Sequence, residues 1–356
     1  MLSRQFARAA AGVTPRAGLR ALSSTAARLD AHTPSMGDVN PSRAAVDTFN
    51  QKQKAFREHL VEAQKEREAS ELPAHPQAAN VPFAKPDEGL QKDDAGRTAE
   101  VKEPEPSRKA GPLTNLIYGT KEGRELDAQL EASFSQVLAR GKYVHSIVFH
   151  EVKPEKVDEY VDLVGHWYPK MANAPENKVH LVGSWRTEVG DCDTFVHIWE
   201  YQKYEGYHQS RHSITHHPEF AEFDRKLKGM INSKNISLMQ EFSFWPTTPP
   251  RQLGGVFELR SYTLHPGNLL EWETHWRRGL KARREVMEGV GAWFVQVGDL
   301  NTVHHLWQFA NLEERRARRE QSWQVEGWSD TVHKTVPLIQ SMKSRVLIPM
   351  PWSPVA

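Results

Sequence analysis

Two histidines and two tryptophans stand at matching places in two copies of one pattern, GSWRTEVGDCDTFVHIWEY and GAWFVQVGDLNTVHHLWQF. Across a constant offset of 108 residues, His197 and Trp199 correspond to His305 and Trp307. An imidazole beside an indole can bind a flat or acyl ligand in a cavity, or move a proton near neutral pH. A hydrogen-bonded core histidine also explains the pattern, and we favour it because no carboxylate pair, nucleophile or Gly-rich phosphate loop accompanies the copies. We therefore keep the four residues as candidates for ligand binding and assign no catalytic residue.

A histidine row is the second candidate for chemistry. His208, His212 and His216 recur every four residues, which places their imidazoles on one face of a helix, where they could hold zinc. No cysteine joins them, and an unaccompanied histidine row is more often a solvated polar face. We expect neither a metal site nor a cofactor, and zinc titration should show no stoichiometric binding.

Basic residues gather in the second half of the chain and could attract an anionic membrane. They are Arg277, Arg278, Lys281, Arg283, Arg284, Arg315, Arg316, Arg318 and Arg319. Glutamates alternate with them, so a salt-bridged surface is favoured, and peripheral contact with an anionic membrane stays open as the alternative.

The composition excludes one class of partner. The 356 residues carry 46 Lys and Arg against 45 Asp and Glu, so no strongly basic surface is offered to nucleic-acid phosphates. The single cysteine, Cys192, excludes an intrachain disulfide. No apolar run reaches the ~20 residues that cross a bilayer, so we expect a soluble or peripheral protein.

The sequence of the amino-terminal part predicts a targeting segment followed by a linker. Residues 1–29 hold five arginines and no acidic residue, which favours a mitochondrial presequence over a disordered basic tail and the matrix as the location. Residues 30–112 read mostly as a disordered linker. Within them, apolar residues at helical spacing favour an amphipathic helix over 42–70, which needs a partner surface to be stable.

Two modules follow, each in the order strand, helix, strand, strand, helix, strand. Residues 143–152 and 256–264 are rich in β-formers, and each segment ends in a Lys-Pro or His-Pro turn that leads into a helix. The repeated pattern is a hairpin with Gly and Asp at its turn. Two prolines, Pro349 and Pro351, mark the last strand as irregular or as an edge of its sheet.

Such βαββαβ modules cover one sheet face with two helices and leave the other face bare. Here the bare face is apolar, so it needs a cover, and the nearest cover is the other module. The predicted fold is therefore α+β: two tandem ferredoxin-like βαββαβ modules packed face to face as a pseudo-twofold α/β barrel.

Many motifs of the two modules agree with one family, in order and at natural spacing. The segments FHEVKPEKVDEY, LVGSW, VHIWEY, QEFSFW, FELRSYTLHPG, EWETHW, VHHLW, TVPL and IPMPWSP resemble the NIPSNAP family of mitochondrial proteins. The resemblance divides into a first module at 143–246 and a second at 254–354. It implies the dimeric α/β-barrel fold, a mitochondrial address and, for some animal members, a scaffold role that recruits autophagy machinery to damaged mitochondria.

Two functions follow from these features. The first is a non-enzymatic mitochondrial binding or scaffold protein linked to mitophagy, with mitochondrial proteins and autophagy adaptors as partners. The alternative is a small-ligand binder or cofactor-free enzyme that uses the barrel cavity. A roomy cavity with His197 or His305 exposed to it favours the alternative, and a filled aromatic core favours the scaffold. A homo-oligomer is compatible with both.

Short autophagy-receptor motifs pair an aromatic residue with an aliphatic residue three positions later, beside acidic residues. Tyr160 with Leu163, and Phe309 with Leu312, fit these letters. Tyr160 lies on an apolar helical stripe and Phe309 ends a core strand, so we expect both aromatic residues to be buried.

Overall fold

The structure is a computed structural model that describes residues 33–71, 143–245 and 249–356. The predicted presequence, and the linker from residue 72 onward, lie outside the described residues. A helix, α1 (Arg43–Glu71), occupies the range for which the sequence favours an amphipathic helix. Among the described helices, none is both long and apolar enough to cross a membrane.

Each module follows the predicted order of strands and helices. The first contains β1 (Tyr143–Val152), α4 (Val157–Asn173), β2 (Val179–Val189), β3 (Thr194–Gln202), α5 (Lys203–Thr215), α6 (Phe220–Met230) and β4 (Ile231–Glu241). The second contains β5 (Val256–Leu264), α7 (Leu269–Val286), β6 (Glu288–Val297), β7 (Thr302–Phe309), α8 (Leu312–Ser322), α9 (Trp328–Thr335) and β8 (Ile339–Pro349). The second helix of each module is broken in two, whereas the sequence pattern predicts one continuous helix. Pro218 stands between α5 and α6, and Gly327, with a left-handed φ of 86°, caps the start of α9.

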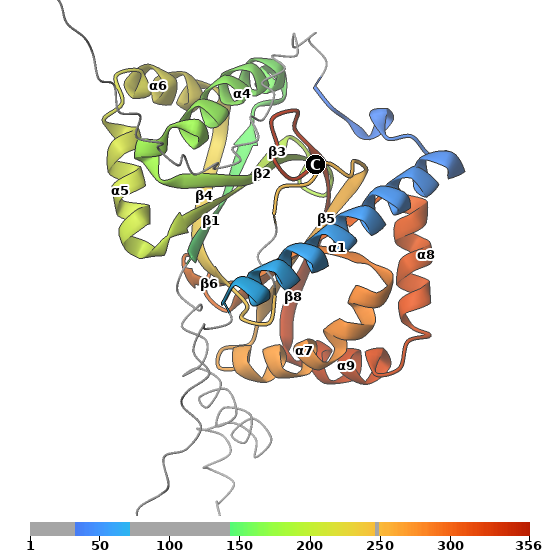
Figure 1. Ribbon diagram of the computed structural model, residues 1–356. Coiled ribbons are helices and arrows are strands. Elements are labelled where there is room, and N and C mark those ends of the chain that lie inside the picture. Colours follow the sequence, from blue (N-terminus) through green and yellow to red (C-terminus); the bar gives the residue numbers. More distant parts are fainter. Residues whose placement is uncertain (1–32, 72–142, 246–248) are drawn as a thin grey trace, which may run out of the picture. The chain divides into compact units, whose positions relative to one another are not determined.

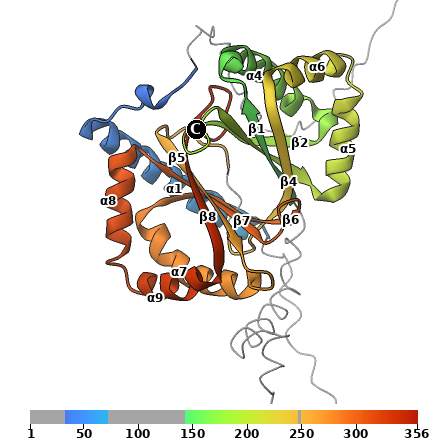
Figure 2. The same ribbon diagram turned by 180° about the vertical axis from the view of Figure 1, so that it is seen from behind.

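The eight strands close into one barrel in the order β1-β3-β2-β8-β5-β7-β6-β4. Each module contributes a four-stranded antiparallel sheet, β4-β1-β3-β2 or β8-β5-β7-β6, and the seams are the antiparallel pairs β2 with β8 and β4 with β6. Figures 1 and 2 show α4, α5 and α6 on the first sheet and α7, α8 and α9 on the second. The predicted tandem α/β barrel is confirmed.

The sequence marks the last strand as irregular or as an edge of its sheet, and β8 is the end strand of the second module's own sheet, with a register shift in each of its two ladders. β8 pairs with β2 on one side and β5 on the other, because closure of the barrel leaves this sheet no edge there. Pro349 is the last residue of β8 and lies opposite Trp185. Because the strand ends there, the missing N–H of this proline interrupts no hydrogen bond further along β8.

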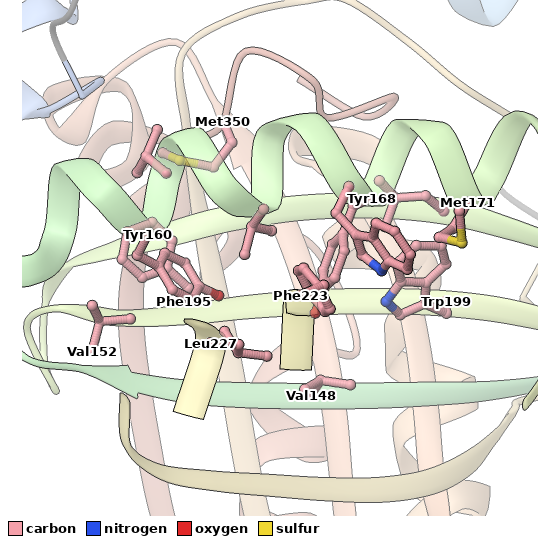
Figure 3. Close-up of a cluster of buried hydrophobic side chains, with 14 of the residues drawn as sticks. Val148, Val152, Tyr160, Tyr168, Met171, Phe195, Trp199, Phe223, Leu227 and Met350 are labelled. Carbon is pink, nitrogen blue, oxygen red and sulfur yellow. The ribbon is translucent and has the colours of Figure 1, made fainter. Parts of the chain in front are cut away.

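Alternate residues along each strand face either the barrel interior or the helices outside it. The inward faces and Val355 of the C-terminal segment build one apolar core; its strand residues are Ile147, Trp185, Val196, Ile198, Met239, Phe257, Leu259, Val290, Trp293, Val295, Leu306 and Leu347. The outward faces pack against the helices in two further clusters, one for each module. Figure 3 shows the first of these, with Tyr168, Trp199 and Phe223 between α4 and the strands.

The repeated Gly-x-Trp letters have a packing cause. A Cβ atom on Gly183 would clash with the indole of Trp185, and a Cβ on Gly291 would clash with the indole of Trp293. Each glycine lies at a register shift in its strand, and both indoles are fully buried in the inner core. Both copies of the repeat therefore contain a glycine at this position, because the indole of the tryptophan two residues later lies against the backbone of the glycine.

Helix α1 packs against the second module through an apolar cluster and several polar contacts. Phe49 is buried in a small cluster with Leu253 and Ala310. One turn further along α1, Nε2 of Gln53 donates to a carboxylate oxygen of Glu288 at 2.9 Å, and Nε of Arg57 donates to the same oxygen at 2.9 Å. The second module thus provides the partner surface that a weakly amphipathic helix needs.

Candidate functional site

The four histidine and tryptophan candidates lie on the outer face of the barrel, under the helices. Trp199 packs in the first outer cluster and Trp307 in the second. His197 is bonded to a side chain of α4, and the ring of His305 lies 5.2 Å from that of Trp276 on α7. Neither histidine is among the residues that face the barrel interior in the described part of the chain.

His197 belongs to a buried chain of polar side chains. The hydroxyl of Tyr160 lies 2.7 Å from Nδ1 of His150 and 2.8 Å from Nε2 of His197. Nδ1 of His197 lies 2.9 Å from Oγ of Ser184. Burial lowers the pKa of His150 to about 3, with a smaller effect of Lys234, and burial lowers the pKa of His197 well below its usual value. Both imidazoles are therefore neutral at pH 7, and they satisfy polar groups within the interface between helix and sheet.

The second copy uses different partners at the same place. Nε1 of Trp307 donates to Nδ1 of His305 at 2.6 Å, and burial keeps the pKa of His305 well below its usual value. Trp199, by contrast, lines a cavity of about 140 Å³ beneath α4, so a ligand-binding role for this residue stays a prediction. His197, His305 and Trp307 line neither this cavity nor the larger one described below.

The histidine row forms no metal site in the structure. The rings of His212 and His216 lie 4.1 Å apart, and Nδ1 of His216 donates to the backbone carbonyl of His212 at 2.8 Å. His208 lies beside Tyr207 on the same helix, α5. The described residues contain no group of three or more His, Cys, Asp or Glu side chains arranged to hold a metal ion.

The arginines of α8 are largely paired. Arg316 bonds Glu313 and Glu320 on its own helix, and Arg315 donates two hydrogen bonds to the buried carboxylate of Glu258. On α7, Arg283 is itself buried, with its guanidinium 4.0 Å from the ring of Trp328. The arginines of α8 thus form the salt-bridged surface that the alternating charges favour.

The larger cavity has a volume of about 780 Å³ and opens at the end of the barrel where the β2–β3 and β6–β7 hairpins turn. We call it the barrel-mouth cavity. Its walls come from both modules and comprise Phe149, Glu151, Asp191, Cys192, Thr194, Ser233, Asn235, Ser261, Thr263, Asp299, Leu300, Thr302, His304, Ser341, Lys343 and Arg345. Further into the barrel the same strand faces carry the apolar core, so the polar space ends inside the barrel.

Three charged groups of this cavity are bonded to neighbouring side chains. Nη2 of Arg345 donates to a carboxylate oxygen of Asp191 at 2.6 Å, and the guanidinium lies 5.2 Å from the ring of Phe149. Oγ of Ser233 donates to Glu151 at 2.9 Å. These contacts fix the cation of Arg345 in the second module and the carboxylates of Asp191 and Glu151 in the first.

His304 and Ser261 form a polar pair in the wall. Oγ of Ser261 lies 2.8 Å from Nδ1 of His304, and the imidazole is buried. Burial lowers the pKa of His304 to about 4, and the nearby Arg345 acts in the same direction. The imidazole is therefore uncharged at pH 7 and can exchange hydrogen bonds with a ligand, but it is a weak base.

The two modules do not contribute equally to this cavity. At the inward positions of β8 stand Lys343 and Arg345, whereas the positions 108 residues earlier on β4 hold Asn235 and Ser237. His304 likewise replaces an apolar residue, Val196, of the first module. The basic groups and the histidine of the cavity thus come from the second module alone.

The repeat singles out His305 and gives no weight to His304, its neighbour on the opposite strand face. The sequence nevertheless contains a signal for His304. The segment TFVH of the first copy corresponds to TVHH in the second, so the inward-facing Val196 is replaced by His304. A polar residue that replaces an apolar one at an inward position of a duplicated strand indicates a function that the duplication does not share.

Both modules match one known protein family. The NIPSNAP family model matches residues 146–246 and 257–354. Protein NipSnap homolog 1 of Danio rerio is 39% identical over 60% of this chain and 76% of its own length. Protein NipSnap homolog 2 of Homo sapiens is 37% identical over 65% of this chain and 82% of its own length.

Among solved structures, this chain is similar to an uncharacterized NIPSNAP-like domain protein from Burkholderia xenovorans. The two are 33% identical, with a TM-score of 0.26, over 27% of this chain and 85% of that one. The resemblance carried by the motifs is confirmed by the family match over both modules. The chain belongs to the NIPSNAP family.

Proposed function

We propose that this chain is a mitochondrial protein that binds a small polar molecule in the barrel-mouth cavity, without a catalytic step of its own. The volume of about 780 Å³ falls within the ~300–1,000 Å³ typical of ligand pockets. Inward-facing hydroxyl, amide and charged side chains of both modules surround this space. That shared polar lining is the observation that carries the proposal.

The chemistry of the walls defines the ligand class. Lys343 forms no hydrogen bond or ion pair with any residue that the structure describes, so its ammonium is available to an anionic group of the ligand. Hydroxyl groups of Ser341 and Thr263 stand in the same wall. A polar molecule with one anionic group directed at β8 and further hydrogen-bonding groups directed at the first module fits this arrangement.

Binding without catalysis is supported by the state of the ionisable groups. His304 is a weak base because its pKa lies about 4, and the carboxylate of Asp191 is engaged by Arg345. A general base needs a pKa near the working pH to be effective. The cavity is therefore better suited to hold a molecule than to transform it.

A cavity-filling variant tests this proposal. Ser341→Trp places an indole in the cavity wall from an exposed position, whereas Met342→Trp places one on the neighbouring, outward-facing position that is 51% exposed. Each protein is incubated with a metabolite extract of mitochondria, passed through gel filtration, and its retained small molecules are identified by mass spectrometry. We expect wild type and Met342→Trp to retain a molecule that Ser341→Trp loses. Equal retention by all three proteins, or none by wild type, contradicts the proposal.

The mitochondrial matrix address is proposed from the arginine-rich, acid-free composition of residues 1–29 together with the family. Residues 1–42 fused to a reporter should enter the matrix of isolated mitochondria, and the same fusion with its arginines changed to glutamine should stay outside. Equal import of both fusions would show that the basic residues are not the signal.

A scaffold role in mitochondrial quality control is the second candidate, and one surface residue favours it. Trp323, at the end of α8, is 52% exposed, and exposed tryptophans are enriched at protein interfaces. The two autophagy-motif letter matches do not serve this role, because Tyr160 and Phe309 are buried. Mitochondrial proteins and autophagy adaptors, as the partners, would therefore bind to other surfaces of the protein.

Proximity labelling in intact mitochondria, before and after depolarisation, tests the scaffold role. Trp323→Ser should lose partners that the matched variant Tyr204→Ser, on an exposed tyrosine of the first module, retains. Identical partner sets for both variants would remove the scaffold role from this surface. Flotation with anionic and neutral liposomes, and sedimentation analysis, test membrane contact and self-association separately.

A further inference from the structure

The cavity of about 140 Å³ beneath α4 lies in the first module, on the helix-covered face of the sheet, and is separate from the barrel-mouth cavity. We call it the aromatic pocket. Its walls come from β1, β3 and β4 below and from α4, α5 and α6 above. Trp199, one of the four sequence candidates, forms part of its floor.

Aromatic rings make up the inside of this pocket. The rings of Trp167 and Phe223 are stacked with centroids 4.7 Å apart, and Tyr168 meets Trp199 edge to face at 4.9 Å. All four side chains are buried, and Figure 3 shows Tyr168, Trp199 and Phe223 converging between α4 and the strands. Such walls favour a flat apolar body, which can lie against ring faces and edges.

The rim of the pocket is cationic. Arg211 of α5 and Lys234 of β4 both line it, and both residues are exposed at its opening. They are close enough for Arg211 to lower the pKa of Lys234, after the larger effect of burial. Asp224, also on the rim, is engaged by Lys228 at 2.5 Å. Neither Arg211 nor Lys234 has a side-chain hydrogen bond or ion pair with a described residue, so neither cation is in direct contact with the carboxylate of Asp224 on the same rim.

The size of the pocket limits its occupant. An apolar cavity of ~150 Å³ accommodates one benzene molecule, so a pocket of about 140 Å³ holds a single ring. An arginine beside a lysine recognises a carboxylate by charge-assisted hydrogen bonds. A monovalent carboxylate also costs less to desolvate than a dianionic phosphate and is repelled less by Asp224.

From this combination we propose that the aromatic pocket binds a small aromatic carboxylate, with the ring among Trp167, Tyr168 and Trp199 and the carboxylate on Arg211 and Lys234. The site does not depend on the barrel-mouth cavity. The equivalent layer of the second module is occupied by its own indoles, since Trp272 and Trp276 are stacked 4.8 Å apart and Trp245 lies parallel to Trp276.

Benzoate is the probe for the full-length protein, measured by calorimetry and by saturation-transfer NMR. We expect one benzoate per chain with a dissociation constant of about a millimolar or tighter. Benzamide, of the same shape without the charge, should bind at least about tenfold more weakly, and so should benzoate to Arg211→Gln. Phenyl phosphate should bind no better than benzoate.

Three variants distinguish binding in the aromatic pocket from binding elsewhere on the protein. Ile214→Trp, at a half-buried position of the pocket wall, should abolish binding, whereas Lys226→Gln, a charge removal on the exposed side of α6, should leave it unchanged. Ser341→Trp in the barrel-mouth cavity should also leave it unchanged, so loss of one site does not mimic loss of the other. The proposal is overturned by no binding of benzoate to wild type, by equal binding of benzamide, or by full binding to Arg211→Gln and Ile214→Trp.

Discussion

The hydroxyl of Tyr160 lies 2.8 Å from Nε2 of His197, and this bond joins α4 to the middle of β3. In the second module the equivalent of Tyr160 is Trp272, since β1 and β5 align at an offset of 112 residues. Trp272 offers no acceptor, and His305 is bonded by Trp307 instead. The duplicated histidine thus keeps its place in the strand, whereas its hydrogen-bond partner differs between the two modules.

Removing that hydroxyl should destabilise the first module. Tyr160→Phe keeps the ring but leaves Nδ1 of His150 and Nε2 of His197 buried without partners. Unsatisfied buried polar groups cost about 1–3 kcal/mol each, so for two groups we expect a loss of about 2–6 kcal/mol in the free energy of unfolding by urea. Tyr204→Phe, on an exposed tyrosine of the same module, should change it by less than about 0.5 kcal/mol. Similar stabilities for the two variants would show that the bonded chain contributes nothing.

The repeated glycines give a second prediction. Gly183→Ala and Gly291→Ala each place a methyl group where an indole lies, so Trp185 or Trp293 must move within the closed barrel core. Overpacking of this kind costs about 1–3 kcal/mol. Gly229→Ala on α6, where a Cβ meets no atom within 4 Å, is the matched control and should be neutral or slightly stabilising. The test is the midpoint of denaturant unfolding of each of the three variants. Midpoints equal to that of wild type for both Gly183→Ala and Gly291→Ala would contradict the packing role of these glycines.

The architecture could be predicted from the sequence because it rests on local signals that agree. β1 and β5 have the predicted bounds, Tyr143–Val152 and Val256–Leu264, and the duplicated hairpin predicts a duplicated sheet. The breaks in the second helices could not be predicted, because the effects of Pro218 and Gly327 on a helix depend on the packing around them. The sequence of β8 also does not show that the outer side of this strand pairs with β2 when the barrel closes.

The candidate site was harder to predict for a geometric reason. Period-2 alternation assigns residues to two faces but does not say which face becomes the barrel interior, and a one-residue step exchanges His305 for His304. The cavity also combines residues from strands and turns of both modules, such as Glu151 and Lys343, which no sequence spacing relates. Only the tertiary arrangement brings them together.

Anchoring of α1 gives a third prediction. Phe49→Ala removes its buried ring from the cluster with Leu253 and Ala310, so α1 should open locally without unfolding of the barrel. Amide hydrogen exchange should rise along α1 by at least about tenfold while β6 and β7 remain protected. Lys54→Ala, on an exposed side of the same helix, should leave the exchange unchanged. Equal protection of α1 in both variants would show that Phe49 is not its anchor.

The carboxyl group of Glu241, near the end of β4, predicts a pH dependence of stability. Burial raises its pKa to about 9, with a smaller effect of the neighbouring Glu200 in the same direction. Between pH 4.5, its usual pKa, and about 9, the folded chain holds a proton that the unfolded chain has released, so stability falls as pH rises through this window. Glu241→Gln removes the titration, and its midpoint of thermal unfolding should exceed that of wild type by more at pH 8.5 than at pH 5. Glu222→Gln, an exposed control, should run parallel to wild type; parallel curves for Glu241→Gln as well would contradict the raised pKa.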